Sequence, residues 1–292
     1  MNRRSRRRLT GIAYLAPALI FVLAFTVYPL GHMIWMSLHN WSLIAPPKFV
    51  GLANYKRAFG DHQFWVSFVF TLKYTALITP VLIVGGYLLA LLTAQNSPLR
   101  RFTRTVVFIP VVIGLGVSSL LWYWLFSTDF GLVNRALMDL GLVSEPVLWL
   151  GVDADRSNWA IIISVVWKVI GFGMILFVGA IQAIPPDAIE AAVVDGASYR
   201  LRLFGVILPL TLRTILLVTL VSVIGSLLAF DQFYLMTAGQ PQNETATSVF
   251  YVYLNSFPYL KLGYGAALSL VLAGTILAFT IVQLVLTRRS HA

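Results

Sequence analysis

The sequence contains no cysteine in its 292 residues. It therefore has no disulfide framework, no thiol nucleophile and no thiolate metal ligand. Charged residues make up only 11% of the chain, against about 25% in typical soluble domains. Hydrophobic residues make up 59%, and the mean hydropathy is +0.83. A chain with so few charges cannot cover its surface in water, so we expect an all-α integral membrane protein.

Short catalytic motifs are missing as well. None of the four histidines is paired at H-E-x-x-H spacing, and there is no G-x-S-x-G nucleophile motif. An integral-membrane enzyme is therefore an alternative without a supporting motif. The phosphate-binding pattern G-x-x-x-x-G-K-[ST] is also absent, so we expect no ATP site in this chain and no enzymatic activity of its own.

Six apolar runs are long enough for the ~20 residues that a bilayer core requires. The run at 11–37 follows five arginines, as a secretory signal would, but it exceeds the roughly 7–15 apolar residues of such a signal. We therefore expect a retained first span and a single membrane domain over 11–287, between a basic segment 1–10 and a short end 288–292. The predicted spans are 11–37, 68–94, 105–126, 160–181, 214–236 and 264–287.

The net charge of +10 is explained by membrane topology, and nucleic acid is not an expected partner. If the N-terminus lies inside, the inside segments hold 13 lysines and arginines and the outside segments hold 6. Basic residues collect on cytoplasmic loops, so both termini should be cytoplasmic. The longest outside segment, 127–159, should contain an amphipathic helix that carries Leu132, Ala136, Leu137 and Leu140 on one face.

The inside segment 182–213 carries the signals of a helix–turn–helix. Pro185 and Pro186 suit a helix start, because proline is tolerated in the first turn. Gly196 can adopt the left-handed conformation that ends a helix, and Ser198 can cap a second helix that should run until Pro209. The first helix is small and nearly neutral, which favours a protein groove over a lipid surface as its partner.

This segment also carries a recognisable motif. "EAAVVDGASYRLRLFGVILP" resembles the EAA signature of ATP-binding-cassette importer permeases, with a valine at 206 where the family has isoleucine. "FVGLANYKRAF" at 49–59, "FGLVNRALMDLGL" at 130–142 and "FDQFYLMTAGQP" at 230–241 are similar to the carbohydrate-uptake branch of that family. The residues that match the signature are Glu190, Ala191, Ala192, Gly196, Leu208 and Pro209, with Asp195 beside them.

The resemblance covers roughly residues 10–287 and implies both a mechanism and partners. It implies a multi-pass permease in a bacterial or archaeal cytoplasmic membrane, in contact with membrane lipid. A second, unlike permease subunit would form the other half of the pathway. Two ATPase subunits would bind ATP and magnesium, so this chain would carry no cofactor. An extracytoplasmic solute-binding protein would deliver a sugar, or alternatively glycerol-3-phosphate or a related polar solute.

Within the EAA segment, Glu190 has two interpretations. In the first, implied by the resemblance, its carboxylate contacts an ATPase subunit. In the second it is an anion near a helix N-terminus, where the helix dipole stabilises it by ~0.3–1 kcal/mol. Asp195 lies at the opposite end of the same helix, where the dipole is unfavourable, so we expect a basic partner such as Arg200.

Two charged residues fall at membrane depth. Lys168 lies about eight residues into the fourth predicted span, where a lysine costs at least ~2.5 kcal/mol. It should therefore face the protein interior or a wet cavity. Asp231, in the fifth predicted span, is at a similar enough depth to be its partner. A structural ion pair and a role in the transport path are both open.

The fifth predicted span carries hydroxyl and aromatic side chains at i+4 spacing, namely Ser222, Ser226, Phe230 and Tyr234. On a continuous helix these four side chains share one face. Hydroxyl groups beside aromatic rings suit a sugar site, but serines also let membrane helices pack closely. Both interpretations are open. Glycines at 171, 173 and 179 are expected to be helix-contact residues.

Overall fold

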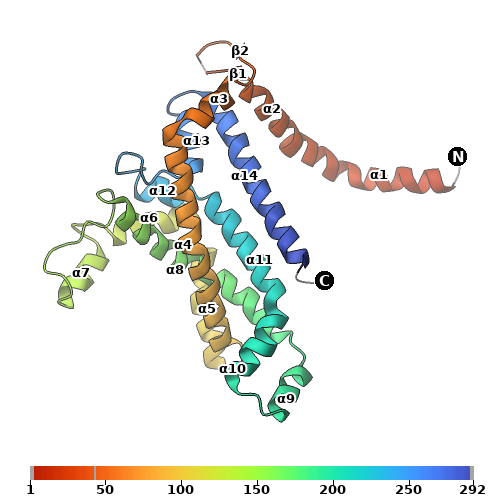
Figure 1. Cartoon of the computed structure of the whole chain (residues 1–292), viewed down its shortest axis with the longest axis vertical. Helices are drawn as coiled ribbons and strands as arrows, with labels where there is room; N and C mark the ends of the chain where they lie inside the picture. Colours follow the sequence, from red (N-terminus) through yellow and green to blue (C-terminus); the bar gives the residue numbers. More distant parts are fainter. Residues whose placement is uncertain (1–2, 43, 290–292) are drawn as a thin grey trace. The chain divides into compact units, whose positions relative to one another are not determined.

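The computed structural model describes residues 3–42 and 44–289 and is mostly helical (Figure 1). The chain divides into two compact units. The first comprises the described part of Met1–Asp61 together with Val252–Thr275, and the second comprises His62–Tyr251 with the described residues from Ile276 onward. Helices α13 (Ser248–Ser256) and α14 (Leu262–Arg289) each contribute to both units.

The first unit begins with a long helical stretch. α1 (Arg3–Val22) continues through a π-helical turn, η1 (Leu23–Val27), into α2 (Tyr28–Ser37). A two-stranded antiparallel ribbon follows, β1 (His39–Asn40) with β2 (Lys48–Phe49), in which His39 pairs with Phe49. α3 (Ala53–Gly60) completes the N-terminal part of the unit.

Asn54 fixes the connection between α2 and α3. Its side chain is buried, and its amide nitrogen donates to the carbonyl oxygens of Ser37, at 2.8 Å, and of His39, at 3.0 Å. At the same place, the hydroxyl of Tyr55 lies 2.7 Å from the hydroxyl of Ser37. The "ANY" of the 49–59 motif therefore closes the helix end, where backbone groups would otherwise lack partners.

The second unit holds the remaining helices. Its long members are α4 (His62–Thr93), α8 (Ala154–Gln182) and α11 (Leu208–Leu227). Shorter helices lie between them in the sequence: α5 (Pro98–Val112), α6 (Leu115–Leu125), α7 (Leu132–Asp139), α9 (Pro186–Val194), α10 (Tyr199–Arg202) and α12 (Asp231–Met236), with a second π-helical turn, η2 (Leu203–Ile207). α7 corresponds to the amphipathic helix predicted in 127–159.

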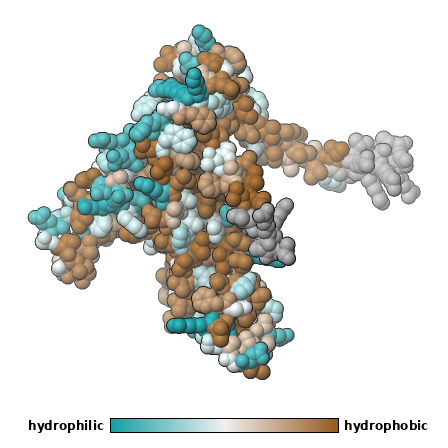
Figure 2. All heavy atoms as spheres, in the orientation of Figure 1, coloured by the Kyte–Doolittle hydropathy of each residue, from teal (hydrophilic) through white to brown (hydrophobic). Residues whose placement is uncertain are grey.

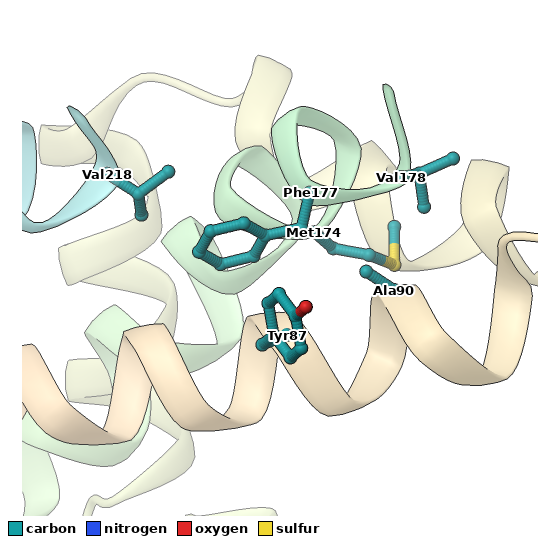
Figure 3. Close-up of a cluster of buried hydrophobic side chains, with 6 residues drawn as sticks. All are labelled: Tyr87, Ala90, Met174, Phe177, Val178 and Val218. Carbon is teal, nitrogen blue, oxygen red and sulfur yellow. The ribbon is translucent and has the colours of Figure 1, made fainter. Parts of the chain in front are cut away.

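The core of the second unit lies where α4, α8 and α11 meet. Tyr87, Phe177 and Val218 are buried there with their neighbours (Figure 3). The rings of Tyr87 and Phe177 pack edge to face at 5.1 Å, and the Tyr87 hydroxyl lies 2.8 Å from that of Thr211. Aromatic pairs of this geometry contribute about 0.5–1.5 kcal/mol beyond the burial of their area.

Two glycines allow α8 to pack closely. A Cβ at Gly171 would overlap the carbonyl oxygen of Val107 in α5 and would lie 3.0 Å from the Cα of Phe108. Gly173 faces Val218 of α11 at 3.5 Å. Both are helix-contact residues as expected. The third expected contact glycine, Gly179, has no neighbour within 4 Å of its Cβ position, so the structure shows no such contact there within this chain.

The third predicted span is not one straight helix. α5 and α6 are bent by 99° at Ile113–Gly114, where the backbone is extended. Pro110 removes one backbone donor just before the break. The prediction of one continuous span at 105–126 is therefore corrected to a broken pair that begins earlier, at Pro98.

The fifth predicted span differs at both ends. At its start, Pro209 does not stop a helix. η2 widens the turn before this proline, and the amide of Leu208 donates to the carbonyl oxygen of Leu203, five residues back. α10, η2 and α11 are therefore continuous from Tyr199 to Leu227. Wide turns of this kind accommodate a missing hydrogen bond without ending the helix.

At its other end, the helix stops at Leu227 rather than running to 236. The freed carbonyl oxygen of Ala229 accepts a hydrogen bond from the Thr247 hydroxyl, at 2.7 Å. α12 then starts at Asp231. The predicted span 214–236 is therefore two helices separated by Leu228–Phe230.

Five helices are long and apolar enough to cross a membrane, or six if the bent pair counts as one span, within the described residues. Figure 2 shows hydrophobic residues along the helices of the second unit, with hydrophilic side chains around the loops near α7 and around the end that holds α9 and α10. The all-α membrane fold predicted from the sequence is confirmed.

Candidate functional site: an exposed helical hairpin and a membrane cavity

The EAA segment folds as the helix–turn–helix expected from its sequence. α9 begins at Pro186, directly after Pro185, and Asp187 lies in its first turn. The second helix, α10, begins after Ser198, whose hydroxyl accepts from the amide of Leu201 at 3.4 Å. Both starts follow local rules, because proline suits a first turn and a serine oxygen satisfies a free amide at a helix start.

Gly196 ends α9 with a Schellman motif. Its φ is +73°, and its amide donates to the carbonyl oxygen of Val193 at 3.0 Å. The amide of Ala197 donates to Ala192 at 2.9 Å, which completes the pair of reversed hydrogen bonds. Space around Gly196 is open, since a Cβ would meet nothing within 4 Å. Within this chain, glycine is therefore required for its backbone conformation rather than for close packing.

Most of the surface of α9 is free within its own chain. No residue of the helix is buried, and Val193 and Val194 are 52% and 87% exposed. Glu190 and Ala191 are exposed and Ala192 is half-buried. Asp195 is exposed, and the structure shows no ion pair with Arg200 among the described residues. An apolar helix face that its own chain leaves uncovered is the kind of surface that a partner protein covers.

One continuous helix connects this hairpin to the membrane region. α9 contacts η2, which leads directly into α11. Leu208 is half-buried against the core cluster, and Pro209 is exposed beside it. From Tyr199 to Ser226 the helix is about 40 Å long at ~1.5 Å per residue. In Figure 1, α9 and α10 lie at one end of the second unit and α11 leads away from them.

The far part of α11 lines a cavity of about 190 Å³ inside the second unit. Its walls come from α4, α6, α8, α11 and α12. The wall is mostly apolar, and four polar side chains interrupt it, namely Tyr74, Ser222, Ser226 and Gln232. Gln232 donates to the Tyr74 hydroxyl at 3.4 Å, and Ser226 donates back to the carbonyl oxygen of Val223 at 3.0 Å. No charged side chain lines this cavity.

The residues predicted for the fifth-span face separate into two groups. Ser222 and Ser226 line the cavity together. Phe230 and Tyr234 instead stack on each other at 5.3 Å, and both pack edge to face on Phe250. The four side chains therefore do not share one face, because the helix is broken between Leu227 and Asp231.

Lys168 is buried as predicted, but its partner is different. Its ammonium group donates to the carbonyl oxygen of Val111 at 2.9 Å, next to the break between α5 and α6. Lys168 does not line the cavity, and no ion pair joins it to Asp231 among the described residues. Asp231 lies in the first turn of α12, where the helix dipole favours an anion. The geometry thus assigns Lys168 to a broken helix end, where a cation stabilises unpaired carbonyls.

Two cavity residues, Tyr74 and Gln232, were not predicted from the sequence. Both are buried polar residues in the cavity wall. Gln232 lies within the "FDQFYLMTAGQP" motif, where a lone amide in an apolar stretch is a signal for an internal hydrogen bond. Tyr74 gives no comparable signal, because tyrosine is common near membrane surfaces.

A family model described as "Binding-protein-dependent transport system inner membrane component" matches residues 83–291. The match covers more than two thirds of the chain, so the chain belongs to this family of membrane permease subunits of ATP-binding-cassette importers. Members are transport components whose ATPase is a separate subunit, so this chain is a transport subunit and not an enzyme.

The chain is similar over nearly its whole length to permeases of transport systems for sugars and a sugar derivative. It is 32% identical to the sulfoquinovosyl glycerol transport system permease protein SmoG of Agrobacterium fabrum, over 96% of this chain and 91% of that protein. It is 33% identical to the trehalose/maltose transport system permease protein MalF of Thermococcus litoralis, over 96% of this chain and 94% of that one.

A solved structure has the same fold. A chain of a bacterial ABC transporter that imports the acidic polysaccharide alginate superposes with a TM-score of 0.85, at 24% identity, over 97% of this chain and 96% of that one. A second structure of an alginate transporter, bound to a periplasmic protein that carries an alginate pentasaccharide, gives the same TM-score at 23% identity.

Proposed function

We propose that this chain forms half of the translocation pathway of an importer for a neutral sugar, with the α9–α10 hairpin as its contact to an ATPase subunit. The observation that carries the proposal is the continuous helix from the exposed hairpin to the cavity wall. A movement imposed on α9 passes through the turn at Gly196 and the contact of α9 with η2 into one unbroken helix, which carries Ser222 and Ser226. Rigid elements of this kind carry coupling between distant sites.

The assigned roles follow from that geometry. The EAA residues, Glu190, Ala191, Ala192, Asp195 and Gly196, form the docking surface of the segment 182–213. Leu208 and Pro209 join this surface to the membrane domain. Both termini face the cytoplasm, so the hairpin faces the ATPase subunits and residues 127–159 face outward. A solute-binding protein meets the outer side.

The cavity supports a neutral solute. Its polar groups are hydroxyls and one amide, which suit the hydroxyl groups of a sugar. A phosphate such as that of glycerol-3-phosphate favours a site with arginines, and the cavity wall has no basic side chain. At about 190 Å³ the cavity is smaller than the ~300–1,000 Å³ of most ligand pockets. A second, unlike permease subunit is proposed to supply the other part of the site.

A substitution in the cavity tests this function. Ser226→Phe should abolish uptake, because the ring fills the cavity, while the complex should still assemble. Leu217→Phe is the control, since Leu217 lies on the same helix, is 50% exposed and does not line the cavity. The measurement is uptake of labelled trehalose, maltose and lactose, together with the amount of assembled complex. Wild-type uptake by an assembled Ser226→Phe complex would show that this face merely packs.

A further inference from the structure

A second hollow in the same unit is larger and chemically different from the cavity. It has a volume of about 820 Å³, and we call it the outer groove. Its walls are the first turns of α4, the segment before α8 with the first turns of α8, and the loop after α12. Six of its lining residues carry the argument: Trp65, Phe70, Lys73, Asp155, Asn158 and Glu244.

The groove contains an unsatisfied buried group. Asn158 is 4% exposed, and its side-chain oxygen has no hydrogen-bond partner. Buried polar atoms are almost always paired, so the amide of Asn158, a residue in the wall of the groove, has unused hydrogen-bonding capacity. A ligand hydroxyl can pair with this amide as donor or as acceptor. This is an observation independent of the surface charges.

The other groups define which ligand fits. The rings of Trp65 and Phe70 offer apolar faces, and the carboxylates of Asp155 and Glu244 accept hydrogen bonds. Three exposed carboxylates, those of Asp153, Asp155 and Glu244, against one lysine disfavour a phosphate or sulfonate, and Lys73 disfavours a metal ion. Aromatic faces beside several hydrogen-bond acceptors and donors match a neutral polyhydroxylated ring. The volume lies within the range of small-molecule sites.

The position of the groove relates it to the inner cavity. The two hollows share helices α4 and α8, and Leu77 of the groove is the neighbour of Ile78 in the cavity wall. In the proposed orientation the first turns of α4 and α8 face outward. A solute released outside would therefore meet the groove before the cavity, about 20 Å further along α4 from Trp65 to Ile78 at ~1.5 Å per residue.

We infer that the outer groove is an entry subsite that holds one neutral sugar unit before it reaches the cavity. The inference rests on the proposed import of a neutral sugar and adds a site on the outer side of this chain. Asn158 and the carboxylates of Asp155 and Glu244 bind the sugar hydroxyls, and Trp65 packs on the ring.

The absence of cysteine allows a direct test. Val69→Cys places one thiol in the groove, at a residue that is 47% exposed. Trp159→Cys is the control, since Trp159 adjoins Asn158 in sequence, is 51% exposed and does not line the groove. The complete importer in nanodiscs is treated with a membrane-impermeant maleimide, with and without sugar. The probe is whichever of trehalose, maltose and lactose the importer transports, and glycerol-3-phosphate is the charged comparison.

The transported sugar should slow labelling of the Val69→Cys thiol about fivefold or more and leave the control thiol unchanged, while glycerol-3-phosphate should protect neither. Equal labelling rates with and without sugar overturn the subsite. Equal protection by unliganded binding protein also overturns it, because the groove is then a protein contact. Transport of none of the three sugars overturns the proposed function, and this inference with it.

Uptake kinetics give a second readout that does not depend on the thiol. Trp65→Ala and Asp155→Asn should each raise the half-saturating sugar concentration about tenfold, equivalent to about 1.4 kcal/mol, and leave maximal uptake intact. Trp159→Ala should change neither value. Asp155 is exposed, so its variant should fold even if changes at the buried Asn158 do not. Wild-type half-saturation in both groove variants contradicts the inference.

Discussion

Replacing Gly196 should uncouple transport from ATP hydrolysis without unfolding the membrane domain. The residue has a φ of +73°, which a β-branched side chain rarely adopts. For Gly196→Val we expect local strain on the order of 1–3 kcal/mol. Such strain lowers the population of the hairpin conformation about 5- to 150-fold. The two hydrogen bonds of the Schellman motif, at 3.0 and 2.9 Å, would be lost with it.

The rest of the protein should tolerate this change. α9 buries no residue in its own chain, and no atom lies within 4 Å of a Cβ at Gly196. The core of α4, α8 and α11 is built from other residues. The variant should therefore reach the membrane at the normal level with its partner permease bound. The measurements are co-purification of the ATPase subunits and ATP hydrolysis stimulated by loaded binding protein.

A matched variant separates conformation from bulk. Asparagine is several-fold enriched at positive φ, so Gly196→Asn should keep the hairpin and most of the stimulated hydrolysis. If both variants lose stimulated hydrolysis equally, the partner surface requires the absence of a side chain at residue 196 rather than the turn conformation. Wild-type ATPase binding and stimulation in Gly196→Val would refute the reasoning, and the hairpin would not be the coupling element.

Three further predictions concern packing and topology. Gly171→Ala should lower the thermal midpoint of the complex, because its Cβ overlaps α5 and overpacking costs about 1–3 kcal/mol, whereas Gly179→Ala should not lower it; an equal midpoint for both would contradict the packing. Lys168→Glu puts a carboxylate against a carbonyl oxygen and should reduce the yield of assembled complex about tenfold below Lys168→Met; equal yields would place Lys168 in a wet pathway. Glu145→Cys should react with an impermeant reagent in intact cells, and labelling only after permeabilisation would reverse the topology.

The hairpin could be predicted from the sequence because local rules determine it. The proline start, the left-handed glycine and the serine cap each act within a few residues, and all three are observed. The long apolar helices were predictable for the same reason, since the bilayer requires length and composition only. These features need no knowledge of distant contacts.

The breaks within the predicted spans depend on contacts between distant residues, which a local sequence pattern does not contain. The stretch Leu228–Phe230 has no glycine or proline, and its free carbonyl is satisfied by Thr247, which is 18 residues away. The i+4 pattern of Ser222, Ser226 and the two aromatic residues therefore predicted a face that does not exist. At Pro209 the local rule failed in the opposite direction, because a π-helical turn absorbs the missing donor.

ATP-driven uptake in proteoliposomes tests the central claim most directly. Vesicles contain this chain, its partner permease and the ATPase subunits, with ATP inside and loaded binding protein outside. Labelled trehalose, maltose or lactose should accumulate only when ATP and binding protein are both present, and the Ser226→Phe complex should accumulate none. Accumulation without ATP, or of none of these sugars while glycerol-3-phosphate accumulates, would contradict the account.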